Sequence, residues 1–95
     1  MANSILQSEK ECYITRRTDE LQRHHIFFGS NRSKSKKCGC WVWLRPDWHT
    51  GDYGPHHNRE LDLLLKRACQ KKFEETHTRE DFVRIFGKNW LDVYD

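Results

Sequence analysis

The sequence contains no apolar run close to the roughly 18 residues that a membrane-spanning helix needs. Residues 1–10 have neither the basic segment nor the apolar segment of a secretory signal peptide. Both absences predict a cytoplasmic protein that has no contact with a membrane.

Closely spaced cysteine pairs of the C-x-x-C type are also missing. The four cysteines are Cys12, Cys38, Cys40 and Cys69, so a closed zinc site built from four thiolates is not expected. Because no export signal is seen, reduced thiols are expected rather than disulfides. The C-x-C spacing of Cys38 and Cys40 is a weak metal or redox signal, and ordinary buried thiols explain it more simply.

The chain has room for only one small domain. With 95 residues, of which 36% are hydrophobic and 33% charged, its core must be small, and a bound metal ion would help to stabilise it. Four Trp, three Tyr and five Phe argue against disorder. We expect a flexible N-terminus over residues 1–10 and a single domain over residues 11–95.

Positive charge is unevenly distributed. The formal net charge is only +3, yet in residues 16–37 only Asp19 and Glu20 oppose a run of basic side chains. A local cationic stretch beside aromatic residues attracts phosphate-rich partners, although a solvated basic loop explains the charge equally well. The basic residues are Arg16, Arg17, Arg23, Arg32, Lys34, Lys36 and Lys37.

Two segments are expected to form β-strands. Residues 21–28 and 41–44 are rich in β-branched and aromatic side chains, and Pro46 should end the second strand. Residues 29–37 are small, polar and basic without an apolar period, which predicts a loop. Residues 49–55 are rich in glycine and polar groups, which predicts another loop.

Apolar side chains then recur at helical spacing. They predict a helix over residues 59–75 with Asn58 as its N-cap. Thr78 has an acidic residue three positions later and should begin a second helix that ends at Gly87. Two strands followed by two helices indicate an α+β domain. The side chains expected to face inward are Leu61, Leu64, Leu65, Ala68, Cys69, Phe73, Phe82, Ile85 and Phe86.

Five of the six histidines fall at the ends of predicted elements. His24 and His25 lie in the first strand, His49 follows the second, and His56 and His57 precede the long helix. Neighbouring residues of a strand face opposite sides, so His24 and His25 should not point to one place. Antiparallel pairing would bring His49 to the first strand and the next loop would return His56, which indicates a metal site. Solvent-facing histidines without a common partner are the alternative.

The order of these motifs resembles an HNH, or ββα-metal, nuclease domain. The resemblance rests on RHHIFF at residues 23–28, on His49 after the second strand, and on GPHHNRELD at residues 54–62. It covers residues 11–91 and is closest to the short HNH-like proteins of bacteriophages and prophages. It implies a ββα-metal core, in which a β-hairpin is followed by a long amphipathic helix, plus a short C-terminal helix.

The resemblance also implies roles for individual residues. His24, His49 and His56 would bind one divalent metal ion (Zn, Ni, Mn or Mg), and His25 would be the general base. Three imidazole ligands suit Zn²⁺, Ni²⁺ or Mn²⁺ better than Mg²⁺. Asn58 would position a ligand or a phosphate, and the partner would be DNA in the cytoplasm of a bacterial host. The residues expected to bind phosphates flanking the cut are Arg16, Arg17, Arg23, Arg32, Lys34, Lys36 and Lys37.

The sequence departs from the HNH pattern in three ways, one of which is that the usual acidic or further metal ligands are not obvious, although Asp47 and Asp52 lie close by. Many HNH domains hold a structural zinc ion between two C-x-x-C knuckles. Here the first knuckle retains only Cys12, and the second, residues 45–48, retains no thiol. Cys40 stands where the family has its middle Asn. A second interpretation is therefore a non-catalytic phage inhibitor of host defence, which would bind a defence protein or sequester a nucleotide signal. In that case Trp41, Trp43 and Tyr53 would stack on a base.

Overall fold

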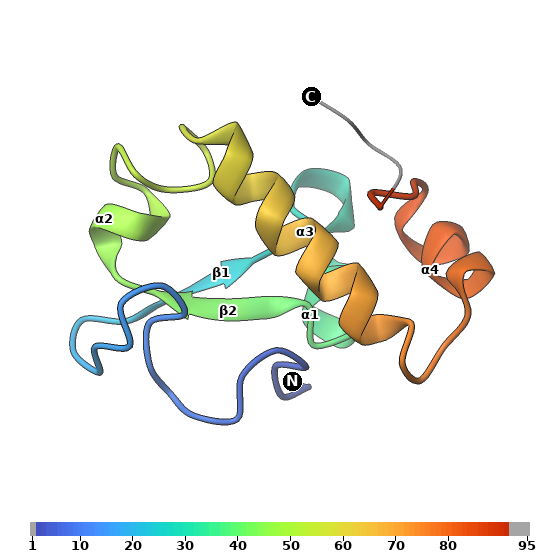
Figure 1. The fold of residues 1–95 in the computed structure, drawn as a ribbon, viewed down its shortest axis with the longest axis horizontal. Helices are drawn as coiled ribbons and strands as arrows, with labels where there is room; N and C mark the ends of the chain where they lie inside the picture. The colour runs from blue at the N-terminus through green and yellow to red at the C-terminus, as the bar shows by residue number, and fades with distance from the viewer. Residues whose placement is uncertain (1, 92–95) are drawn as a thin grey trace.

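The computed structural model describes residues 2–91, so positions 92–95 of the predicted domain lie outside the described residues. A two-stranded antiparallel hairpin, β1 (Gln22–His25) and β2 (Trp41–Leu44), is crossed by the long helix α3 (Arg59–Phe73), and α4 (Arg79–Phe86) packs beside one end of α3 (Figure 1). The small α+β domain is compatible with a ββα arrangement. None of the helices in residues 2–91 combines the length and apolar character that crossing a membrane requires.

The hairpin places His24 opposite Val42 and His25 opposite Trp41. The predicted first strand, residues 21–28, is shortened to four residues; beyond its end, the backbone N–H of Phe27 donates to the Ser35 hydroxyl at 3.1 Å. The second strand has its predicted bounds and ends before Pro46, which begins the short helix α2 (Pro46–His49).

The predicted loop over residues 29–37 is wrong. This segment forms a 3-10 helix, η1 (Gly29–Asn31), followed by α1 (Arg32–Lys37). Ser35 is its one buried residue, and its hydroxyl accepts from Phe27 and donates to the carbonyl of Cys40. A helix held by a single small polar side chain has no apolar period, so no periodic pattern indicated it.

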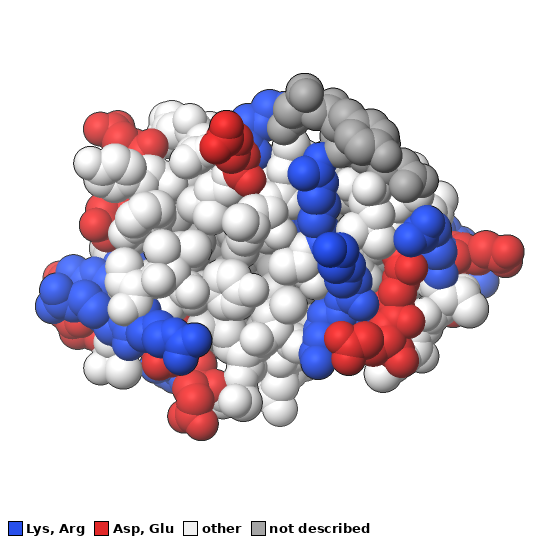
Figure 2. Space-filling model, in the orientation of Figure 1, with Lys and Arg blue, Asp and Glu red and all other residues white. Residues whose placement is uncertain are grey.

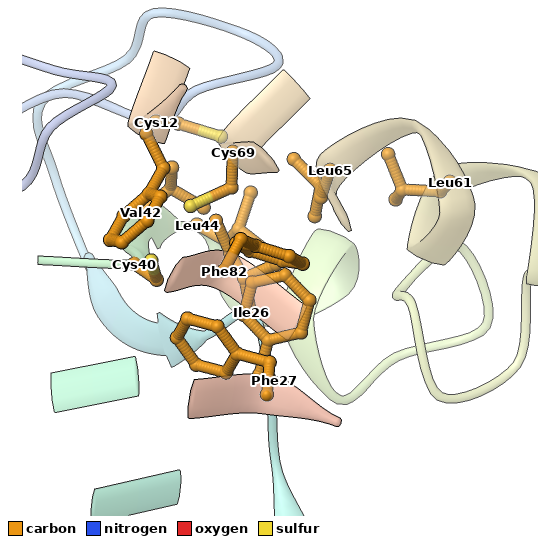
Figure 3. Close-up of a cluster of buried hydrophobic side chains, with 12 residues drawn as sticks. Cys12, Ile26, Phe27, Cys40, Val42, Leu44, Leu61, Leu65, Cys69 and Phe82 are labelled. Atoms are coloured by element: carbon orange, nitrogen blue, oxygen red, sulfur yellow. The ribbon is translucent and has the colours of Figure 1, made fainter. Parts of the chain in front are cut away.

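The core lies between the hairpin, α3 and α4, as Figure 3 shows. Leu64, predicted to face inward, is 53% exposed, whereas Leu63 is only 1% exposed. Three consecutive leucines leave it ambiguous which of them face the core, and the structure places Leu63 and Leu65 inward and Leu64 outward. Of the remaining predicted inward residues, Ala68 and Ile85 are half-buried, and the buried ones are Leu61, Leu65, Cys69, Phe73, Phe82 and Phe86.

The predicted start of α3 and both predicted ends of α4 are confirmed, whereas α3 ends at Phe73 and not at the predicted residue 75. The side chain of Asn58 accepts from the N–H of Leu61 at 3.2 Å and caps α3. Thr78 and Asp81 form a reciprocal capping box at the start of α4, and Gly87 ends that helix at φ 81°. Local hydrogen-bonding chemistry alone sufficed to place these boundaries.

The N-terminal segment, expected to be flexible, lies along the outer edge of β2 (Figure 1). The hydroxyl of Ser4 donates to the carbonyl of Trp41 at 2.6 Å, and the side-chain carbonyl of Gln7 accepts from the N–H of Trp43 at 2.8 Å. These contacts cover a strand edge that β1 leaves unpaired. They are polar and long-range, so a pattern of apolar residues could not reveal them.

Candidate metal centre

Three histidines from separate segments converge beside the hairpin. His24 belongs to β1, His49 is the last residue of α2, and His56 lies in the turn before α3. One ring nitrogen of each lies within 4.8 Å of the other two. The ring centroids are 5.3 Å apart for His24 and His49, and 5.8 Å apart for His24 and His56.

His24 is the most buried member of this histidine cluster. Its side chain is 1% exposed, and no residue in the described range 2–91 gives its Nε2 a hydrogen-bond partner. Leaving such a nitrogen unsatisfied costs about 1–3 kcal/mol. Burial, followed by the neighbouring His49 and His56, lowers the pKa of His24 to about 3. The ring is therefore neutral at physiological pH, which is the form that binds a metal.

His49 is oriented by a residue that the sequence analysis did not single out. Its Nδ1 lies 2.8 Å from Oε1 of Gln22. With that oxygen accepting, Nδ1 carries the proton and Nε2 is left with its lone pair for an ion, an arrangement common around metal-binding histidines. Burial lowers the pKa of His49, and His56 lowers it further. Because Gln22 is two residues before His24 in a strand, alternation could have indicated its position on the same face.

The turn between His49 and His56 is packed tightly against the end of α2. A side-chain carbon at Gly54 would overlap the carbonyl oxygen of His49, and one at Gly51 would lie 2.8 Å from the Cα of Asp47. The N–H of His57 then donates to the carbonyl of Gly54 at 3.0 Å. Glycine at these positions lets the chain turn back closely enough to bring His56 to His49.

The positively charged side chain of Lys66 lies beside the histidine cluster. The ammonium of Lys66, whose residue is 8% exposed, is 4.6 Å from the ring centre of Phe28 and 2.8 Å from Asp62. The Phe28 ring in turn lies 4.9 Å from that of His56. Lys66 contributes to the lowered pKa of His24. The i,i+4 spacing of Asp62 and Lys66 predicts their ion pair, but their closeness to the site was not foreseen.

His25 faces the other side of the hairpin from His24. It borders a cavity of about 570 Å³ together with Arg23, Arg32, Ser33 and Lys36. Within the described part of the chain, its Nε2 is buried without a hydrogen-bond partner. Burial lowers the pKa of His25, as do Arg32 and, more weakly, His49. His25 is thus separate from the histidine cluster but within its electrostatic reach.

The other predicted phosphate-binding residues are dispersed. Arg17 pairs with Asp19 at 3.2 Å, and Arg16 borders a different cavity beside the N-terminal segment. Lys34 and Lys37 are exposed on α1 and do not line the cavity beside His25. On the face that α3 crosses, basic side chains form separate groups with acidic side chains beside them (Figure 2). Asn58 uses its side-chain oxygen to cap α3.

The donor set fits a small divalent ion. Tetrahedral ligands at about 2.0–2.1 Å from zinc lie roughly 3.3 Å from one another. Nitrogen atoms already within 4.8 Å reach that spacing through small side-chain rotations. Three imidazoles, one of them buried and unpartnered, suit a borderline metal and leave a position open for a further ligand.

Comparisons with protein-family models, with curated proteins and with solved structures give no match to this chain. The functional argument therefore depends on the residues themselves and on how the fold arranges them.

Proposed function

We propose that this protein is an HNH-like, metal-dependent endonuclease that hydrolyses phosphodiester bonds of DNA. The observation that supports it best is the convergence of His24, His49 and His56 around one point. These three residues would hold one divalent ion, with Zn²⁺, Ni²⁺ or Mn²⁺ favoured over Mg²⁺ by the nitrogen ligands. When bound, the ion would stabilise the negative charge that develops on the scissile phosphate and the leaving oxygen.

His25 is the proposed general base. Its lowered pKa keeps the ring neutral at physiological pH, and a neutral ring nitrogen can accept the proton of the attacking water. Its position on the opposite face of β1 from His24 prevents both rings from binding the same ion in a regular strand. This separation supports different roles for the two neighbours, one as a ligand and the other as a base.

Cleavage of plasmid DNA tests the proposal. Purified protein is incubated with supercoiled plasmid and with single-stranded DNA in Zn²⁺, Ni²⁺, Mn²⁺ or Mg²⁺, and we expect nicking or linearisation by the wild type. His25→Ala should abolish cutting while keeping the fold and the bound metal. His57→Ala is the matched control, because His57 is exposed and outside the histidine cluster. Intact DNA in every metal with the wild type would contradict the proposal.

One observation favours a second function, that of a non-catalytic phage inhibitor of host defence. Cys40, at the position of the middle Asn in the HNH pattern, is fully buried. Cys40 packs in the core against Cys69, and this thiol–thiol contact, together with burial, raises the pKa of Cys69. Such a protein would bind a defence protein or sequester a nucleotide signal. A thermal-shift screen with cyclic nucleotides tests the latter, because a ligand of the folded state raises its stability.

A further inference from the structure

The cavity beside His25 gathers positive charge. We call it the cationic cavity; it has a volume of about 570 Å³ and lies on the face of the hairpin opposite to His24. Its lining carries only cationic or hydrogen-bond-donating side chains, and no acidic residue from the described range 2–91 contributes to it. The lining residues are Arg23, His25, Arg32, Ser33 and Lys36.

Two elements hold these side chains in place. Arg23 and His25 come from β1, and the other three lining residues come from α1. The buried hydroxyl of Ser35 joins α1 to the chain after β1 and to the chain before β2. The guanidinium of Arg23 lies 4.4 Å from the ring centre of Trp41, itself 6% exposed. The cations therefore project from an anchored helix and a paired strand, which reduces the ordering cost of binding a ligand.

Charges of one sign meet in this cavity. Arg23, Arg32 and Lys36 all border the same cavity as the ring of His25. Bringing like charges together is unfavourable unless an anion joins them. Two guanidinium groups, an ammonium and a hydroxyl offer the donors that phosphate oxygens accept, and arginine can bind them in a bidentate way.

We infer that the cationic cavity binds a backbone phosphate of the DNA strand, next to the scissile phosphate at the histidine cluster. The inference rests on the proposed nuclease function and narrows it, because it assigns Arg32 and Lys36 to the substrate and leaves Lys34 and Lys37 outside. His25 borders the cavity and directly follows His24, a member of the histidine cluster, in β1. A DNA strand that crosses β1 would therefore place one phosphate in the cavity on one face and a neighbouring phosphate beside the metal ligands on the other.

DNA binding without metal tests the inference independently of cleavage. The affinity of the chelator-treated protein for a fluorescent single-stranded oligonucleotide is measured by anisotropy at several salt concentrations. Arg32→Gln and Lys36→Gln should each weaken binding about tenfold and lower the salt slope by about one. Lys34→Gln and Lys37→Gln are matched controls, since they remove the same charge from exposed positions of α1. We expect less than a twofold change for them.

Several outcomes would overturn the inference. Equal weakening by all four variants would mean general attraction to a basic helix, and no weakening by Arg32→Gln and Lys36→Gln would leave the cavity without a role. Displacement of the oligonucleotide by micromolar AMP would indicate a nucleotide site instead. If the wild type cleaves DNA, but Arg32→Gln and Lys36→Gln bind DNA as tightly as the wild type, the phosphate site is wrong and the nuclease proposal stands.

The opposite combination separates the two proposals in the other direction. If binding depends on Arg32 and Lys36 but the wild type cleaves DNA in none of the metals, the phosphate site is supported and the nuclease proposal is contradicted.

Discussion

The metal-free protein should become less stable as the pH falls from 7 to 5, because of His24. The pKa of this residue is about 3 in the folded protein, against an ordinary value of 6.5. Between these values the unfolded chain binds a proton that folded His24 does not, so acid favours unfolding. This stability is fully present above pH 6.5 and is lost as the pH falls towards 3, by about 1.4 kcal/mol per pH unit.

The loss between pH 7 and pH 5 is about 2 kcal/mol for His24 alone, since it begins only near pH 6.5. Burial also lowers the pKa values of His25 and His49, which adds to the effect in the same direction. A decrease of this size is a large part of the stability of a small domain.

Urea unfolding in the presence of a chelator, followed by tryptophan fluorescence, measures this effect at both pH values. In His24→Asn the loss of stability between pH 7 and 5 should shrink by about 2 kcal/mol. His57→Asn should leave it unchanged, because that histidine is exposed. An equal loss in wild type and His24→Asn would refute the argument that burial keeps His24 neutral.

Four further substitutions test the site and the helix. Gln22→Ala should weaken metal binding about tenfold in calorimetric titration, because His49 loses the acceptor that orients it; unchanged affinity would contradict that role. Gly54→Ala should displace His49 and lower metal affinity at least as much; unchanged affinity would mean that the tight turn does not position His49. Leu63→Ala should cost about 2–5 kcal/mol of unfolding free energy, whereas Leu64→Ala should change it by less than about 0.5 kcal/mol. A reversed order for the two leucines would mean that the helix face is misassigned.

The parts of the fold that follow from local chemistry were predictable. Asn58 and Thr78 cap helices through side-chain hydrogen bonds to residues three positions later, so their roles are legible in the sequence. The phase of α3 was not, because Leu63, Leu64 and Leu65 occur in a row and only tertiary packing decides between them. The helix α1 was missed because its one anchor, the buried Ser35, is polar.

Of the candidate site too, one part was predictable from the sequence and another part was not. His24 lies in the first predicted strand, His49 follows the second and His56 precedes the long helix, so an antiparallel hairpin followed by a helix was enough to bring them together. The contact of Gln22 with His49 depends on where α2 places the second ring. The cationic cavity depends on α1 and therefore could not be anticipated from a segment interpreted as a loop.

X-ray absorption spectroscopy of the protein loaded with Zn²⁺ or Ni²⁺, combined with elemental analysis, tests the central claim most directly. We expect one ion per chain with three imidazole nitrogens at about 2.0–2.1 Å, and loss of the ion in both His24→Ala and His49→Ala. A protein that takes up no metal, or variants that retain the ion with sulfur ligands, would contradict a metal centre formed by His24, His49 and His56.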